Sequence, residues 1–217
     1  MGGGRKNSSR KYFRLHTLKR DNFYRLKSDN LELVTVVECI SAAGAALPPS
    51  FVLSKGDYPE PVDNEVFGSI SVSDTGWTNQ ELTFQWFKEV FVPKAKACRI
   101  NDDPIILFVD GHDSHETDEL KDIAYEENII VVCFPSKCTH KMQPLDIVIY
   151  SSTQRRWQDH CGVRAVQGIK IDRSNVVSEY LSTRSFMTPT LIQAAFHATG
   201  IHPFNPQIFT DVDFEPS

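Results

Sequence analysis

The sequence has no apolar run long enough to span a bilayer, and no apolar stretch follows its first residues, Met1–Lys6. We therefore expect neither a membrane-spanning helix nor a signal peptide. Cysteine is scarce as well, with five residues that are odd in number and dispersed along the chain. This distribution does not suit a disulfide framework and is typical of a reducing compartment. No internal repeat or low-complexity tract is present.

The composition is that of an ordinary globular protein, with 41% hydrophobic, 24% charged and 11% aromatic residues. A length of 217 residues can form one large domain or two small ones, with enough apolar surface for a substantial core. These quantities bound the class of protein but leave its activity open.

The net charge of −5 is distributed unevenly. Residues 1–30 hold nine Lys and Arg against two Asp, a balance of +7, and the remainder has a balance of −12. A basic N-terminal arm could contact phosphates while an acidic body supplies metal ligands. The alternative is that the arm is a solvated, poorly ordered terminus.

Two β-branched segments predict an antiparallel hairpin. Residues 31–42 are rich in Val, Thr and Ile and stop before Gly44. Residues 46–54 follow with prolines at their start, as expected where a strand begins. Residues 70–72 predict a further short strand, whereas residues 1–30 predict a weak strand at best.

A helix is predicted next. Thr78, followed three residues later by Glu81, has the pattern of a capping box, and Leu82 and Trp86 continue at helical spacing. Pro93 marks a weak point near the end of this helix.

The middle of the chain predicts a strand, a helix and a second strand. Residues 105–110 and 129–134 are apolar runs, and residues 115–128 between them have a helical pattern. Two apolar strands joined in this way form a parallel pair with a right-handed crossover. We therefore predict an α/β fold with one mixed sheet, an antiparallel hairpin extended by parallel strands, and helices on both faces. Residues 145–160 and 189–198 predict further helices.

Two aspartates carry most of the functional signal. Asp110 ends the apolar run Ile105–Val109, and Asp146 lies 36 positions later in a predicted helix. A carboxylate at a strand end that meets another on a helix makes an oxygen-rich site suited to Mg²⁺ or Mn²⁺. Two metal ions held in this way can clamp the attacking and the leaving oxygen of a phosphodiester.

Several segments, in this order and spacing, resemble the DDE superfamily endonuclease domain of pogo/Tigger-type transposases, a group that includes centromere protein B. The segments are Val34–Pro49, Gly76–Asn79, Val109–His115, Pro135–His140, Gln143–Asp146 and Ala198–Pro206. The resemblance covers nearly all of residues 1–210 and implies an RNase H-like fold. It also implies a nuclear protein that binds DNA and forms a possible homodimer, as transposases do.

The resemblance further implies three carboxylates that hold Mg²⁺ or Mn²⁺ for DNA strand cleavage and joining. Asp110 matches the second of them and Asp146 the third. The first comes from an Asp-Glu-x-Gly-Phe segment that precedes a stretch resembling Met1–Arg5. No acidic residue precedes Asp21, and Glu38 is the one plausible substitute. We therefore expect a catalytically incomplete, N-terminally truncated domain with weak metal binding.

Other polar residues have two interpretations each. His112, His115 and His140 could position a phosphate or the attacking water, or they could be hydrogen-bonded structural histidines. The basic residues could hold DNA backbone, or they could lie on solvated surfaces. In the arm these are Arg5, Lys6, Arg10, Lys11, Arg14, Lys19 and Arg20, and near Asp146 they are Lys137, Lys141, Arg155 and Arg156.

Two further features favour structural interpretations. Cys133, Cys138 and His140 suggest zinc, but no second Cys pair accompanies them. Trp77 and Trp86 are more typical of core residues than of platforms for stacked bases.

The predicted organisation has three parts: a basic N-terminal arm and first strand region at 1–30, a DDE domain at 31–210 and an acidic tail at 211–217. The leading hypothesis is a DDE superfamily endonuclease domain that binds DNA but is catalytically incomplete. The first alternative is a domesticated, non-enzymatic DNA- or chromatin-binding protein, and the second is another RNase H-like nuclease.

Overall fold

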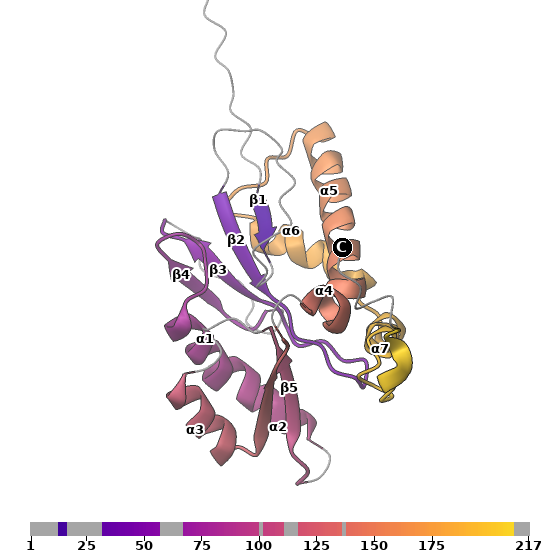
Figure 1. Ribbon diagram of the computed structural model, residues 1–217. Helices are drawn as coiled ribbons and strands as arrows, with labels where there is room; N and C mark the ends of the chain where they lie inside the picture. The colour runs from indigo at the N-terminus through magenta and orange to yellow at the C-terminus, as the bar shows by residue number, and fades with distance from the viewer. Residues whose placement is uncertain are drawn as a thin grey trace, which may run out of the picture.

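The described strands form two sheets in the computed structural model (Figure 1). The structure describes residues 13–16, 32–56, 67–99, 102–110, 117–135 and 138–210. Within these ranges, one sheet has the order β1-β2-β3-β4 and the other has the order β5-β6. The strands are β1 (Phe13–His16), β2 (Glu32–Val37), β3 (Ser50–Ser54), β4 (Ile70–Ser73), β5 (Ile105–Val109) and β6 (Ile129–Cys133).

The larger sheet is built around the predicted hairpin, which the structure confirms. β2 and β3 are antiparallel, with Val34 opposite Leu53 and Val37 opposite Ser50. The connection turns at Gly44, whose φ of +92° favours glycine. β1 pairs with β2 and β4 pairs with β3, both in parallel, so the hairpin is extended by parallel strands on both sides.

The smaller sheet confirms the predicted parallel pair but not its predicted place. β5 and β6 run in parallel register from Ile105 opposite Ile129 to Val109 opposite Cys133. In the described ranges, neither strand joins the larger sheet, so the structure differs from the single mixed sheet expected from the sequence. An apolar run in the sequence indicates that a segment is a strand. Which strands pair with one another depends on contacts between distant segments.

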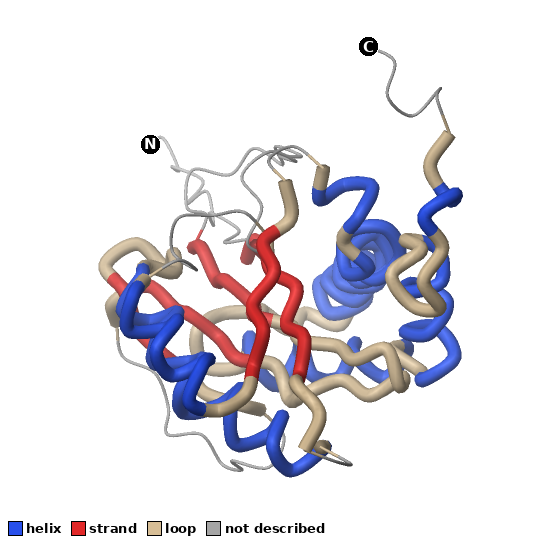
Figure 2. The backbone as a smooth tube through the Cα atoms, turned by 60° about the horizontal axis from the view of Figure 1, so that its bottom comes forward, coloured by secondary structure: helices blue, strands red, loops and turns tan. Residues whose placement is uncertain are grey.

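Helices lie on both sides of the strands (Figure 2). α5 (Tyr150–Val166) and α6 (Val176–Thr183) pack against β2 and β3. In this core Tyr180 meets Phe51 edge-on, with ring centroids 5.6 Å apart. α6 was not predicted from the sequence.

The smaller sheet packs against a different group of helices. They are α1 (Gln80–Trp86), the π-helix η1 (Phe87–Phe91), α2 (Val92–Cys98) and α3 (Asp118–Glu126). Leu120 and Ala124 of α3 are buried in this cluster. A third cluster joins the π-helix η3 (Leu145–Ile149), η4 (Arg184–Phe186) and α7 (Pro189–Ala198). α4 (Thr139–Met142) precedes η3 and contacts it, and η5 (Pro206–Ile208) follows α7. No helix in the described ranges is long and apolar enough to cross a membrane.

The ends of two helices differ from the predictions. α1 is capped by Asn79, whose side chain accepts a hydrogen bond from the Leu82 amide at 2.8 Å, so Thr78 is not the N-cap. Pro93 does not end the helix: it lies in the first turn of α2, directly after the π-helix η1, and the helical stretch continues to Cys98.

Glu179 ties α6 to α5. Its buried carboxylate accepts a hydrogen bond from Arg164 Nε at 2.8 Å and pairs with Nε2 of His160. Burial raises the pKa of Glu179, but the hydrogen bonds from Arg164 and His160 outweigh it and hold the pKa below its usual range. A lowered folded-state pKa stabilises the fold above the ordinary value of about 4.3, and this stabilisation is lost as pH falls through the folded-state pKa.

We therefore expect Glu179→Gln to lower the free energy of unfolding by about 1–3 kcal/mol near neutral pH, because it removes charge-assisted hydrogen bonds. The difference from wild type should shrink as pH falls below about 4. Urea unfolding over a pH series measures both effects. Glu126→Gln, an exposed position on α3, is the control and should change stability by less than about 0.5 kcal/mol. A pH-independent difference between Glu179→Gln and wild type would contradict the assignment.

Candidate active site

Asp110 follows directly after β5 and is only 9% exposed. The amide of Phe134 donates to the carbonyl of Val109 at 2.9 Å, which holds the ends of β5 and β6 together. Asp110 is therefore positioned by the C-terminal end of a parallel strand, as the sequence predicted.

Asp146 lies in η3, in the first turns of a helical stretch that begins at Pro144 and continues through α5. Leu145 and Ile149 are buried on either side of it and anchor the turn. A carboxylate is favourable at this position, because the N-terminal end of a helix has a partial positive charge. The π-helical turn was not predicted, although such turns recur at functional sites.

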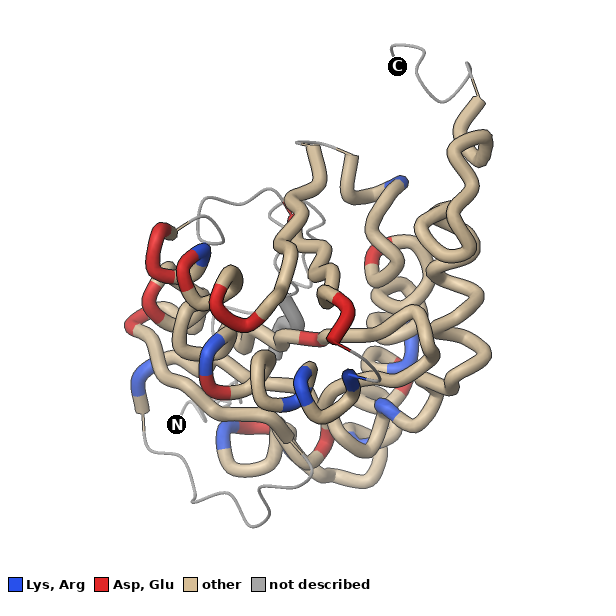
Figure 3. Tube along the Cα trace, turned by 90° about the horizontal axis from the view of Figure 1, so that it is seen from below, with Lys and Arg blue, Asp and Glu red and all other residues tan. Residues whose placement is uncertain are grey.

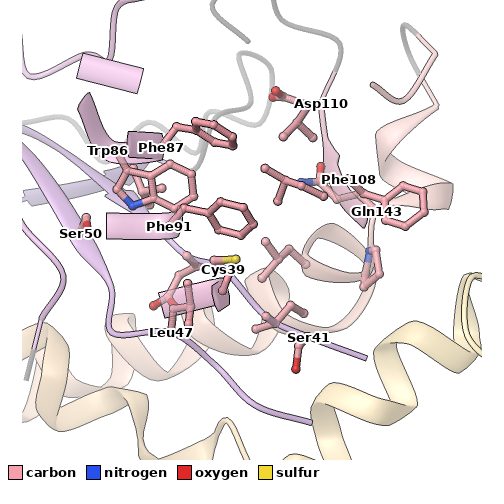
Figure 4. A pocket seen from close by; sticks show the side chains of 18 of the residues that line it. Cys39, Ser41, Leu47, Ser50, Trp86, Phe87, Phe91, Phe108, Asp110 and Gln143 are labelled. Carbon is pink, nitrogen blue, oxygen red and sulfur yellow. The ribbon is translucent and has the colours of Figure 1, made fainter. Parts of the chain in front are cut away.

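Asp110 and the start of this helix border one cavity. It has a volume of about 580 Å³, and Asp110 and the segment Gln143–Leu145 are among its lining residues. We call it the inter-sheet cavity, because β5 and the end of β2 also line it. Figure 4 shows Asp110 at one end of this cavity and Gln143 at its side. Asp146 is the next residue after this lining segment, so the structure brings the elements of both aspartates to one place.

The side-chain chemistry near the cavity fits part of a hard-metal site, although Asp146 itself is not among the lining residues. Asp110, Asp146 and the amide of Gln143 present the oxygen ligands that Mg²⁺ and Mn²⁺ prefer. Within the described ranges, no three or more His, Cys, Asp and Glu side chains form a group that could hold a metal. Cys133, Cys138 and His140 therefore do not form such a group. That Asp110 and Asp146 share a metal stays a prediction.

Glu38, the suggested substitute for the first carboxylate, has another role. Its side chain is buried and accepts hydrogen bonds from Tyr180 Oη at 2.7 Å and from Arg184 Nε at 2.9 Å and Nη2 at 2.7 Å. Both oxygens are thus engaged, so Glu38 is unsuited to ligate a metal. Nothing local in the sequence indicated these partners, which lie 142 and 146 positions away.

This buried carboxylate also affects its neighbours. Burial lowers the pKa of Arg184, but hydrogen bonding to Glu38 outweighs it and raises the pKa above its usual value. Burial, aided by the charge of Glu38, raises the pKa of the Cys39 thiol to about 12. Cys39 therefore stays a neutral thiol at physiological pH.

The remaining candidates are spread over the chain. His140 is exposed and Lys141 is half-buried on α4, whereas Arg155 and Arg156 are exposed on α5. The guanidinium of Arg156 lies 4.9 Å from the centroid of the Phe186 ring. In the view of Figure 3, basic and acidic positions are interspersed. The side chains of His112, His115, Lys137, Arg5, Lys6, Arg10, Lys11, Arg14, Lys19 and Arg20 lie outside the described residues.

The two tryptophans have different environments. Trp86 packs against the core of the smaller sheet, as predicted. Trp77 is 37% exposed, so the prediction of a core position was wrong for it.

Comparison with known proteins shows which family the chain belongs to. The family model described as DDE superfamily endonuclease matches residues 30–196, which include Asp110 and Asp146. The chain belongs to the DDE superfamily endonuclease family. Its relatives identify it as a pogo-like DDE domain, which confirms the predicted resemblance.

Three relatives illustrate the likeness. This DDE domain is 27% identical over 123 residues to the human protein named "Pogo transposable element with KRAB domain", covering 54% of this chain and 19% of that protein. It is 23% identical over 128 residues to the human "Pogo transposable element with ZNF domain", covering 57% of this chain and 9% of that protein. It is 29% identical over 197 residues to a Cochliobolus lunatus protein named "MFS-type transporter clz9", covering 84% of this chain.

The chain spans 20% of the length of the Cochliobolus protein and a smaller share of the human proteins. Their names therefore describe proteins of which this DDE domain matches only a part. No solved structure matches the chain.

Proposed function

We propose that this DDE domain binds DNA in the nucleus and holds Mg²⁺ or Mn²⁺ weakly at Asp110 and Asp146, without cutting DNA by itself. The proposal takes residues 31–210 as the domain. Its main support is that Asp110 and the segment Gln143–Leu145, both within the family match, line one cavity. A family match alone would not bring these elements together.

Bound divalent ions would supply the charge that stabilises the attacking and leaving oxygens of a phosphodiester. The proposal assigns this role to Asp110, which directly follows β5, and to Asp146, which lies between the buried residues Leu145 and Ile149. Glu38 is held by Arg184 and Tyr180 and adds no ligand. Among the described residues the proposal has two carboxylate ligands, which hold a metal pair less well than three would, and misplaced groups reduce reaction rates by large factors. The small number of ligands supports the part of the proposal that the domain does not cleave DNA by itself.

The exposed arginines support the DNA-binding part of the proposal. Arg155 and Arg156 project from α5, the helix that continues from the turn bearing Asp146. Arginines at such a position can contact backbone phosphates without reading the base sequence. The basic residues of the N-terminal arm would add to this surface.

We expect the purified chain to bind a labelled DNA duplex with an affinity that falls steeply between about 50 and about 200 mM salt. Arg155→Glu with Arg156→Glu should weaken binding and reduce the slope of log K against log salt by about two, because two phosphate contacts are lost. Fluorescence anisotropy measures both quantities. Lys88→Glu with Lys94→Glu is the control, since it makes the same charge change at exposed positions of η1 and α2.

Equal losses in the two double variants would assign the effect to net charge and remove α5 from the interface. The same preparations should leave supercoiled plasmid intact in the presence of Mn²⁺. Mn²⁺-dependent nicking that disappears in both Asp110→Ala and Asp146→Ala would show that the chain is a complete nuclease, contrary to the proposal.

A further inference from the structure

The last turns of α5 expose an apolar surface. Val163 and Val166, three residues apart on the same side of the helix, are 55% and 90% exposed, and Ile169, just beyond the helix, is 39% exposed. We call these three residues the α5 patch. Gly162 is exposed beside them, and an added Cβ there would meet no neighbouring side chain or segment within 4 Å, so another helix could approach closely. In Figure 1, this end of α5 lies at the edge of the molecule.

The end of α5 fixes the shape of the patch and leaves it uncharged. The amide of Gly168 donates to the carbonyl of Ala165 at 3.1 Å, and that of Ile169 donates to the carbonyl of Arg164 at 2.9 Å. These two hydrogen bonds form a Schellman motif, with Gly168 at a φ of +74°, and they hold Ile169 against the last turn. Arg164 is the charged residue of this turn, and its Nε donates to the buried carboxylate of Glu179 on α6 at 2.8 Å. Its charge is therefore neutralised within the fold.

Charged residues of opposite sign flank the α5 patch. Asp159 is exposed one turn before Val163, on the same side of the helix, and Lys170 is exposed directly after Ile169. Single exposed apolar residues need no explanation, whereas an apolar surface with a polar border is typical of a protein–protein contact. In the opposite direction the same surface presents basic, apolar and acidic groups, so it complements a copy of itself that runs antiparallel.

A second copy of the chain fits this arrangement in one register. A two-fold contact uses the same surface of both copies, so a contact of one residue with another is repeated in reverse. If two α5 helices pack antiparallel with the axis between positions 164 and 165, Val163 lies opposite the partner's Val166. In the same register, Asp159 faces the end of α5 from which the partner's Lys170 follows, and the flexible lysine stem allows the two charges to meet. The apolar and the charged groups thus require the same alignment.

We propose that the α5 patch is the contact surface of a weak, two-fold symmetric dimer of this chain, in which Asp159 pairs with the partner's Lys170. The patch is small beside the roughly 1,200–2,000 Å² that stable complexes bury, so the dimer should be reversible, with a dissociation constant on the order of 100 µM. The inference depends on α5 and not on DNA or metal binding, so it and the proposed function can fail separately.

Sedimentation equilibrium of the whole chain measures this association. We expect the average mass to rise from that of a monomer toward that of a dimer between about 10 µM and about 1 mM. Val166→Lys should raise the dissociation constant about tenfold or more, because it places a charge in an apolar contact. Tyr125→Lys is the control and should leave it unchanged, since Tyr125 is 88% exposed on α3. A wild-type chain that stays monomeric throughout, or equal effects of the two variants, would overturn the proposal.

Charge reversal tests the partner and the register. Asp159→Lys and Lys170→Asp should each weaken self-association, because each brings like charges together across the two-fold axis. One variant then carries two lysines and the other two aspartates at these positions. An equimolar mixture of the two variants should therefore associate about as strongly as wild type, since each charge meets its opposite. Unchanged association of the single variants, or a mixture no stronger than its components, would exclude the antiparallel contact and overturn the proposal.

Discussion

Arg184→Leu is expected to lower the free energy of unfolding by about 3–5 kcal/mol, because it leaves Glu38 as a buried, uncompensated charge. Three of the hydrogen bonds to the Glu38 carboxylate come from the Arg184 guanidinium, at 2.7–3.1 Å. Arg184 Nη2 also donates to the carbonyl of Leu47 at 2.6 Å, so a backbone acceptor loses its donor as well. Equilibrium urea unfolding measures the change.

Two further variants test the reason for this loss. The double variant Glu38→Leu with Arg184→Leu should be less destabilised than Arg184→Leu alone, since it removes the buried charge together with its partner. Arg155→Leu, at an exposed position of α5, should change stability by less than about 0.5 kcal/mol. If Arg184→Leu lowered the free energy of unfolding no more than Arg155→Leu does, the ion pair with Glu38 would make no measurable contribution to stability.

Gly76→Ala is expected to be strongly destabilising for two reasons that add. Gly76 has a φ of +78°, which costs a residue with a side chain about 1–2 kcal/mol. A Cβ there would also lie 2.4 Å from the carbonyl oxygen of Leu33, in the backbone of β2. Relieving that overlap must move the strand, at a cost of about 1–3 kcal/mol more. The carbonyl of Gly76 accepts a hydrogen bond from Thr35 Oγ1 at 2.7 Å, so the same movement strains a second contact with β2.

Gly168 and Gly162 provide matched controls. Gly168 has a φ of +74°, and an added Cβ would meet no neighbouring side chain or segment within 4 Å. Gly168→Ala therefore measures only the free-energy cost of the positive φ. Gly162 lies in α5, also with nothing within 4 Å, and Gly162→Ala should stabilise the protein by about 0.5–1 kcal/mol. Thermal unfolding of the three variants separates the two contributions. A loss in Gly76→Ala no larger than in Gly168→Ala would show that the Leu33 contact relaxes freely.

Local pattern was sufficient to predict most of the elements that position the candidate site. The apolar runs around β5 and β6 identified a parallel pair, and the helix predicted over residues 145–160 includes Asp146, as the structure shows. α7 was predicted with the bounds it has in the structure, Pro189–Ala198. These predictions succeed because burial of one face imposes a period on the sequence.

Details that depend on competing local contacts were predicted less well. Asn79 rather than Thr78 caps α1, since both residues can accept the same kind of hydrogen bond and packing decides between them. The π-helical turn around Asp146 has no pattern of its own that distinguishes it from an α-helix.

The sequence by itself determined the family, the strands and most helices, and the two aspartates that the family motifs contain, because each is encoded in a short, ordered stretch of residues. Only the tertiary structure decided that Glu38 belongs to a buried contact with Arg184 and Tyr180. It alone also decided that β5 stands apart from β2 across an apolar cavity. Both outcomes depend on which distant segments meet, and no local period in a sequence records the partner of a side chain or of a strand edge.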